Sequence, residues 1–151
     1  MSFTIRPVNK NNQQELLTIA EADARIPLEF DSSHPFDENS VNARLDYYQQ
    51  LSENDFFEVA TQQERIIGFH IVKKSPFPPS HTIANIISLW VHPNFRKQGI
   101  AKELKNRAEY WAKQGGMLWI QTHVHKSNAR MLELNKSNGY EEIYISLRKT
   151  L

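Results

Sequence analysis

The fold of this chain is decided by one stretch, Ser88-Leu89-Trp90-Val91-His92-Pro93-Asn94-Phe95-Arg96-Lys97-Gln98-Gly99-Ile100-Ala101. Its first part continues an apolar, β-branched and aromatic run from Ile86, which is typical of a buried strand. Pro93 cannot donate a hydrogen bond to a sheet, so the strand ends before it. Apolar residues then recur at helical spacing, at Ile100, Ala101, Leu104, Ala108, Trp111 and Ala112. The stretch therefore predicts a strand, a short turn and a helix.

The turn between this strand and helix has the composition of an anion site. It consists of Arg96, Lys97, Gln98 and Gly99, and the helix opens with Ile100, Ala101 and Lys102. The first N–H groups of a helix have no internal partner, and the helix dipole makes that end positive. A phosphate can accept these groups where its approach is open, and Gly99 has no Cβ to block it. Since Arg96 and Lys97 add positive charge, we expect the turn to bind a phosphorylated ligand.

The remaining elements alternate along the chain in a pattern typical of one mixed sheet. Strands are predicted over 3–8, 55–61, 65–73, 86–91, 117–124 and 140–147, and helices over 12–24, 41–51, 100–112 and 128–138. The proline-rich segment 75–80 is expected to lack regular structure. The order β-α-α-β-β-β-α-β-α-β predicts an α/β (α+β) domain over residues 1–151, with a single, mainly antiparallel sheet covered by helices on both faces.

Composition narrows the function classes. The 151 residues carry a net charge of +1, with acidic and basic residues interspersed, so neither a nucleic-acid stripe nor a membrane-surface patch is expected. The chain has no cysteine, which excludes a disulfide framework and a thiolate nucleophile. The first residues lack an apolar signal core, and we expect a cytoplasmic protein.

The motifs together resemble those of the GNAT N-acetyltransferase superfamily. Arg96-x-x-Gly99-x-Ala101 is similar to the family's pyrophosphate motif, and Leu89-x-Val91-x-Pro93 resembles its fourth strand. Gly68 falls where the family has a glycine in its third strand. Asn128, eleven residues before Gly139-Tyr140, resembles the asparagine that opens the fourth helix. The match spans essentially the whole chain.

This resemblance implies an acyltransferase that uses acetyl-CoA, and it implies no metal. In such proteins the fourth strand is bulged and splays from the fifth, and the pantetheine arm pairs with its backbone. The corresponding groups here are those of Leu89, Trp90 and Val91, with the Val91 N–H placed to stabilise an oxyanion. The pyrophosphate would lie on the N–H groups from Gln98 to Lys102, and Asn128 would contact the pantetheine or hold its helix against it.

The sequence departs from the family at the two positions that many members use for proton transfer. Asn135 stands where many members have a tyrosine acid, and an amide can hydrogen-bond a thiolate but cannot act as its general acid. Ile87 stands where many have a glutamate on the fourth strand. The candidates that remain for the catalytic chemistry are Asn135, Ser88 and His70, with His81 and Glu58 as further possible bases.

The acceptor and the partners stay open at this point. The acidic segment from Glu29 to Glu38 is either a solvated turn or an attractor for a cationic amine. A small cationic amine is favoured over a protein amine, and the alternative is an acyl-CoA-binding sensor without catalysis. His123 and His125 share a strand face, but the sequence offers no third metal ligand. The resemblance also makes a homodimer an expected assembly.

Overall fold

The computed structural model describes residues 2–151 and contains one five-stranded sheet in the order β1-β2-β3-β4-β5. The strands are β1 (Thr4–Pro7), β2 (Phe56–Gln62), β3 (Arg65–Phe77), β4 (His81–Val91) and β5 (Ile120–Gln121). Neighbouring strands are antiparallel except for β4 and β5, which are parallel. The prediction of a single mixed sheet is therefore confirmed.

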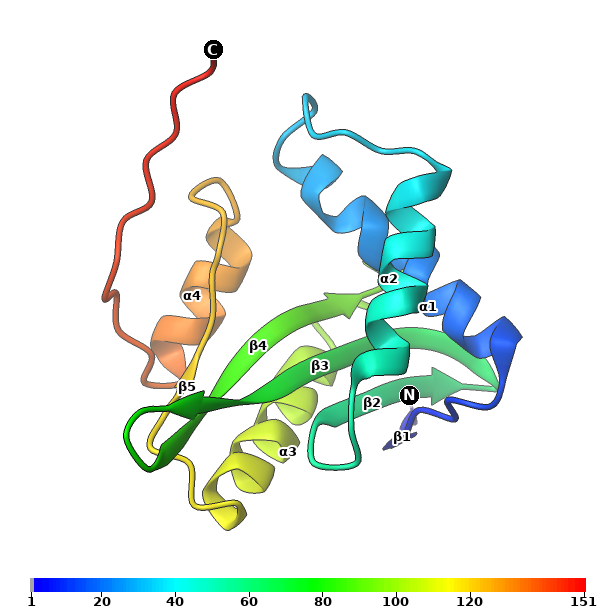
Figure 1. Cartoon of the computed structure of the whole chain (residues 1–151). Coiled ribbons are helices and arrows are strands. Elements are labelled where there is room, and N and C mark those ends of the chain that lie inside the picture. The colour runs from blue at the N-terminus through cyan, green and yellow to red at the C-terminus, as the bar shows by residue number, and fades with distance from the viewer. Residues whose placement is uncertain (1) are drawn as a thin grey trace.

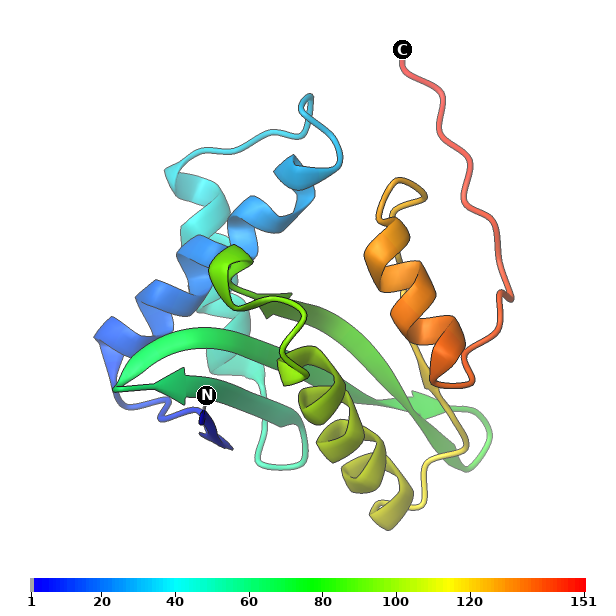
Figure 2. The same ribbon diagram turned by 180° about the vertical axis from the view of Figure 1, so that it is seen from behind.

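Helices lie on both faces of this sheet (Figure 1 and Figure 2). The chain forms α1 (Gln13–Arg25), α2 (Glu38–Gln50), α3 (Ile100–Gln114) and α4 (Ala129–Ser137), with short 3₁₀ turns η1 (Ile26–Glu29) and η2 (Pro93–Phe95). α1 and α2 cover one face and α3 covers the other, while α4 lies beside β5. Asparagines cap two of these helices, because Asn12 accepts from the N–H of Glu15 and Asn128 from that of Met131.

The core has two halves, one on each side of the sheet. Residues of β3 alternate between them, with Phe69 and Ile71 packed toward α1 and α2 and Val72 toward α3. The half under α3 also holds Val91 of β4 with Ile100 and Leu104 of the helix. Because Val91 at the end of β4 and Ile100 at the start of α3 are both buried in this half of the core, the turn between them is held in place at both of its ends.

The expectation of an irregular 75–80 segment is wrong at its start, because β3 continues through Pro76 to Phe77. The N–H of Ala84 donates to the carbonyl of Trp119, the residue before β5, so it points away from β3. Backbone hydrogen bonds alternate along an antiparallel pair, and Thr82, opposite Pro76, therefore also occupies a non-bonded position. Proline costs no ladder hydrogen bond at such a position.

Two predicted strands are shorter or missing. The predicted strand 117–124 pairs with β4 only over Ile120–Gln121, because the chain diverges from β4 beyond that point. The predicted strand 140–147 is wrong for this chain taken alone: the segment is extended and exposed, and no strand of residues 2–151 lies beside it. Alternation fixes a segment's capacity to form a strand, but a ladder also needs a neighbour.

Candidate active site

The outer half of β4 is splayed from β5. In the pairing with β3, Ile71 faces Ser88 while Val72 faces Ile86, so Ile87 is an extra, bulged residue. On the other side, pairing with β5 ends at Asn85. The bulge and the splay expected of the fourth strand are both present, and they open a gap beside residues 86–91.

The free backbone groups of β4 point into this gap. The N–H of His92 donates to the carbonyl of Ile67 at 2.8 Å, which places this pair in the bonded set of the β3–β4 ladder. Because bonded and non-bonded pairs alternate, the N–H groups of Leu89 and Val91 point away from β3. These two donors are available to an extended ligand chain that enters the gap.

The turn before α3 presents a second set of free donors. Gly99 has φ 85° and Lys97 has φ 64°, and both lie in the left-handed region. The first hydrogen bond of the helix runs from the N–H of Glu103 to the carbonyl of Gly99, so the N–H groups of residues 100–102 lack an internal partner. No side chain caps this helix end. A Cβ added at Gly99 would meet nothing within 4 Å, so the approach to these donors is open.

Arg96 is tied into the protein more firmly than the motif indicates. Its Nε donates to the carbonyl of Val91 at 2.9 Å, and its guanidinium pairs with Glu29 at 3.0 Å. Arg130 of α4 reaches the same carboxylate at 3.9 Å. Arg96 therefore links the turn to the end of β4 and to η1. Glu29, at the end of η1, contacts both Arg96 of the turn and Arg130 of α4, and so bridges the gap beside β4.

The fourth helix supplies the opposite wall of the gap. Asn128 caps α4, because its Oδ1 accepts from the N–H of Met131 at 3.1 Å. Asn135 is the one residue of the helix that is buried, with 5% of its surface exposed. Its Oδ1 has no hydrogen-bond partner in the described chain. A buried amide oxygen without a partner is costly, which is consistent with a site that a ligand completes.

The other predicted bases are placed less favourably. His70 is fully buried and packs on the α3 side of the sheet, where burial lowers its pKa to about 3. Its Nδ1 donates to the carbonyl of Ser88 at 2.9 Å, and Nε2 has no partner. The carboxylate of Glu58 is held by Arg107 at 2.5 Å, and His81 is exposed at the β3–β4 turn. Burial and pairing thus keep His70 and Glu58 from direct contact with an acceptor.

Ser88 has a partner that sequence reasoning missed. Its hydroxyl donates to Asp23 of α1 at 2.6 Å, and Tyr48 of α2 donates to the same carboxylate at 2.7 Å. Burial raises the pKa of Asp23, while these hydrogen bonds and Arg44 act in the opposite direction. The signal in the sequence was Asp23 itself, since a carboxylate stands on the apolar stripe Leu16, Ile19, Ala20 and Ala24.

α3 also carries a buried charged residue among its apolar positions, as α1 does with Asp23, and no role was predicted for it from the sequence. Lys105 stands on the apolar stripe of α3, 1% exposed, and burial lowers its pKa to about 8. Its ammonium lies 4.2 Å from the centre of the Tyr140 ring. The hydroxyl of Tyr140 donates to Glu109 at 3.3 Å, and burial raises the pKa of this phenol. This arrangement anchors the chain after α4 to α3.

Two acidic side chains between α1 and α2 have structural partners. Asp37 caps α2 and closes a capping box with Ser40. Asp31 accepts from Ser33 and from Arg148, and these hydrogen bonds lower its pKa to about 2. Glu38, the first residue of α2, is exposed. The acidic segment is thus partly a scaffold for the wall formed by α1 and α2.

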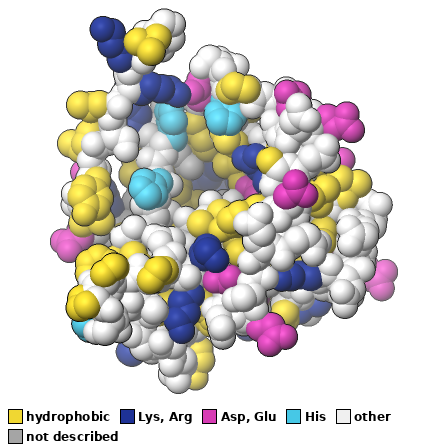
Figure 3. Space-filling model, in the orientation of Figure 1, with side chains coloured by type: hydrophobic (Ala, Val, Ile, Leu, Met, Phe, Trp, Pro, Cys, Tyr) yellow, Lys and Arg dark blue, Asp and Glu magenta, His cyan; other side chains and the backbone are white. Residues whose placement is uncertain are grey.

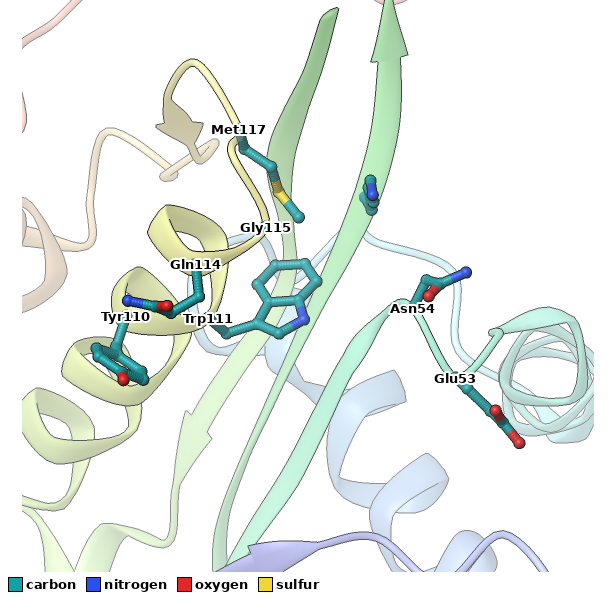
Figure 4. Close-up of a pocket in the computed structure, with 8 residues that line it drawn as sticks. Glu53, Asn54, Tyr110, Trp111, Gln114, Gly115 and Met117 are labelled. Carbon is teal, nitrogen blue, oxygen red and sulfur yellow. The ribbon is translucent and has the colours of Figure 1, made fainter.

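The space-filling view shows a hollow between the α1–α2 wall and α4, with histidine and basic side chains around it (Figure 3). A separate, shallow depression lies at the other end of α3, lined by Glu53, Asn54, Lys74, Tyr110, Trp111, Gln114, Gly115 and Met117 (Figure 4). It is remote from the turn at Gly99. Across residues 2–151, no group of three or more acidic or histidine side chains could hold a metal ion, and no helix is long and apolar enough to cross a membrane.

A family model and a curated relative that match this chain are both of acetyltransferases. The model of the acetyltransferase (GNAT) family matches residues 16–140. A curated relative, GCN5-related N-acetyltransferase 4, chloroplastic, from Arabidopsis thaliana, is 34% identical over 80 residues. That match covers 52% of this chain and only 28% of the relative, so the chain spans less than a third of that protein.

Solved structures share the fold over their full length. A transcriptional regulator from Bacillus halodurans has a TM-score of 0.80 and 21% identity, with 99% of this chain and 100% of that chain covered. The aminoglycoside N-acetyltransferase AAC(6')-Iy, bound to a bisubstrate analogue built on CoA, has a TM-score of 0.69 and 20% identity, with both chains covered completely. At these identities the likeness concerns the fold.

Proposed function

Because the chain belongs to the acetyltransferase (GNAT) family, we propose that it transfers an acetyl group directly from acetyl-CoA to a primary amine. The observation that carries this proposal is the open turn at Gly99 beside the splayed end of β4. One set of free donors suits a pyrophosphate, and the other suits an extended arm that ends at Val91. Cofactor-binding roles are proposed for Leu89, Trp90, Val91, residues 96–102 and Asn128.

The chemistry requires an uncharged amine and a stabilised oxyanion. The amine nitrogen attacks the thioester carbonyl, and the Val91 N–H donates to the oxygen that becomes negative. A primary amine has a pKa near 10 in water, so a proton must leave it before attack. Ser88 lies on β4 at the gap and is bonded to Asp23, and we assign the removal of this proton to that pair. For Asn135 we propose a hydrogen bond from its side-chain amide to the departing thiolate.

A small cationic amine is the acceptor class that the charges favour. Residues 29–38 carry four carboxylates and no lysine or arginine. Glu29 borders the gap, since it contacts Arg130 on the opposite wall. Glu29 and Asp31 are paired with arginines, whereas Asp37 and Glu38 form no ion pair within residues 2–151, so it is these two carboxylates that would attract a polyamine or an aminosugar by long-range electrostatics. A protein amine is the second acceptor class.

Calorimetric titration with acetyl-CoA, followed by thiol release over a panel of small amines and peptides, tests this function. We expect binding, and turnover that is fastest with cationic amines and falls as salt rises. Binding without turnover on any amine would favour the alternative, an acyl-CoA sensor. The absence of acetyl-CoA binding would overturn the assignment of the turn.

A further inference from the structure

Ser88 is held from both faces of the sheet at the bulge of β4. Its hydroxyl donates to Asp23 on the face that α1 covers, and its carbonyl accepts from Nδ1 of His70 at 2.9 Å on the face that α3 covers (Figure 1 and Figure 2). A carbonyl oxygen can only accept, so the neutral His70 ring carries its proton on Nδ1. The removal of a proton by Ser88 and Asp23 makes no use of this second contact.

The His70 ring is fixed by its surroundings. It is fully buried and packs edge-on against Phe56, with ring centres 5.8 Å apart. Glu58 lies opposite His70 on β2 but is paired with Arg107, and Lys105 of α3 places a positive charge near the ring. Burial and this charge lower the pKa of His70 to about 3. The ring is therefore neutral at physiological pH and keeps its donor toward Ser88.

The hydrogen bond acts on a peptide group that faces the gap beside β4. The carbonyl of Ser88 and the N–H of Leu89 belong to the same peptide group, which is planar and trans, so the two bonds point in opposite directions. Because the carbonyl is directed at His70 of β3, the N–H of Leu89 is directed away from β3 and into the gap. Accepting a hydrogen bond also polarises the peptide group, which makes its N–H a stronger donor.

The position of this peptide group explains why it needs such support. The register of the β3–β4 pairing shifts between Ile71 and Val72, so the ladder is disrupted beside Ser88. On the other side of β4, pairing with β5 ends at Asn85. The peptide group thus lies between a disrupted ladder and an unpaired edge. A side chain that bonds its carbonyl replaces the orientation that two neighbouring strands give in a regular sheet.

We propose that His70 is a positioning residue for acetyl-CoA, which fixes the peptide group between Ser88 and Leu89 so that the Leu89 N–H meets the pantetheine arm. This inference rests on the proposed function, because it places the arm in the gap beside β4. The imidazole itself touches neither the cofactor nor the amine. His70 therefore contributes to the binding of the arm and not to the binding of the pyrophosphate at Gly99.

Two substitutions of similar shape separate the hydrogen bond from the packing. The amide nitrogen of His70→Asn is attached to Cγ, as Nδ1 is in histidine, so it can donate to the same carbonyl, whereas His70→Leu has no donor. We expect the Kd and KM for acetyl-CoA to rise about threefold to tenfold in His70→Leu, the effect of one hydrogen bond, and to stay close to the parent's in His70→Asn. Because the arm is bound equally before and during the reaction, kcat should change by less than about twofold.

The phosphorylated ADP half of CoA, without its arm, is the matched control ligand. It reaches only the turn at Gly99, so calorimetric titration should give the same affinity for the parent and both variants. A His70→Leu protein that loses affinity for this half as much as for acetyl-CoA would overturn the proposal, because the whole site would then be damaged. A His70→Asn protein no better than His70→Leu would overturn it as well.

NMR spectra of the protein without ligand test the orientation apart from any activity. The parent should show His70 as the neutral tautomer protonated on Nδ1. The amide signal of Leu89 should shift in His70→Leu and return toward its parent position in His70→Asn. A ring protonated on Nε2, or a Leu89 signal that is the same in all three proteins, would overturn the role of His70 alone. A parent that binds no acetyl-CoA would instead overturn the proposed function, and this role with it.

Discussion

At the scale of single residues, Gly99 should matter more to ligand binding than to folding. Its φ of 85° is strained for any other residue, and the space beside it is open to a ligand rather than filled by protein. We expect Gly99→Val to weaken acetyl-CoA binding about 100-fold, because two charge-assisted hydrogen bonds of about 1.5 kcal/mol or more would be blocked. Calorimetric titration measures this loss.

Gly116 supplies the matched control for this experiment. It follows the other end of α3, has φ 67°, and an added Cβ there also meets nothing within 4 Å. Gly116→Val carries comparable backbone strain without touching the turn, so acetyl-CoA affinity should stay near that of the parent. Equal losses in the two variants would mean that strain, and not the blocked donors, weakens binding at Gly99.

Asn135 is expected to assist the reaction without being essential. Asn135→Ala removes a neutral hydrogen bond to the departing thiolate, which is worth about 0.5–1.5 kcal/mol, so kcat should fall about threefold to tenfold. Thiol release at saturating acetyl-CoA measures this change. A folded variant with no measurable turnover would make Asn135 far more important than a hydrogen-bond donor.

His70 should make the protein sensitive to acid. Burial lowers its pKa from 6.5 to about 3 in the folded state, so between these values the unfolded chain binds the extra proton. Stability from this group is complete above about pH 6.5 and declines as the pH falls, by up to about 1.4 kcal/mol per unit. Urea unfolding from pH 7 to pH 4 should show this slope, and His70→Phe should reduce it, whereas His81→Gln at the exposed turn should not.

At the scale of elements, the sequence predicted well those helices and turns that local residues determine, and predicted less well those strands that depend on a neighbouring strand. α3 and the turn before it were predictable because a proline, a glycine and an apolar stripe act locally. The bulge and the splay of β4 were expected only through a family resemblance, since no local pattern marks Ile87 as the extra residue. β5 and the 140–147 segment could not be settled, because strand formation depends on whether a neighbour lies alongside.

In the candidate site, too, the features set by local sequence could be predicted, and those that depend on contacts between distant residues could not. The free N–H groups of residues 100–102 follow from a helix start, so the sequence could predict them. The Ser88–Asp23 pair joins positions 65 residues apart through a buried hydrogen bond, and such a pairing depends on how α1 packs on β4. Asp23 on the apolar face of α1 indicated a buried carboxylate, but the sequence did not indicate that Ser88 is its partner.

The packing of α1 and α2 on β4 should set the pKa of Asp23, the proposed proton acceptor, because it brings Tyr48 and Ser88 into hydrogen-bond distance of this carboxylate. Tyr48→Phe removes one hydrogen bond that favours ionised Asp23, so the Asp23 pKa should rise and the acidic limb of kcat/KM should move to higher pH. Ser88→Ala should shift this limb in the same direction and also lower the plateau about 100-fold by cutting the link to the amine. The pH–rate profiles of the two variants test this assignment. A Ser88→Ala profile identical to the parent's would remove the pair from the mechanism.

At the scale of the whole molecule, the two walls of the gap differ in how firmly they are held. α1 and α3 each bury five or more residues, and α2 packs Tyr48, Val41 and Leu45 into the core beside α1, whereas α4 buries only Asn135 and adds no side chain to the core clusters. β5 pairs with β4 over only two residues, and the side-chain links across the gap are largely exposed: Glu29 with Arg130, Asp31 with Arg148, and Phe30 stacked on His125 with ring centres 6.0 Å apart. The wall that carries Asn135 is therefore the one that a ligand can order.

Hydrogen exchange should reveal this difference directly. Amides of α4 are expected to exchange faster than those of α3, because few buried contacts oppose local opening of the shorter helix. Acetyl-CoA should slow exchange in residues 129–137 and at the start of α3, since it would contact both walls at once, while amides of α1 facing the core should change little. Protection confined to the turn at Gly99 would mean that the arm of the ligand does not reach the gap between β4 and α4, and the proposed transfer site would then lie elsewhere.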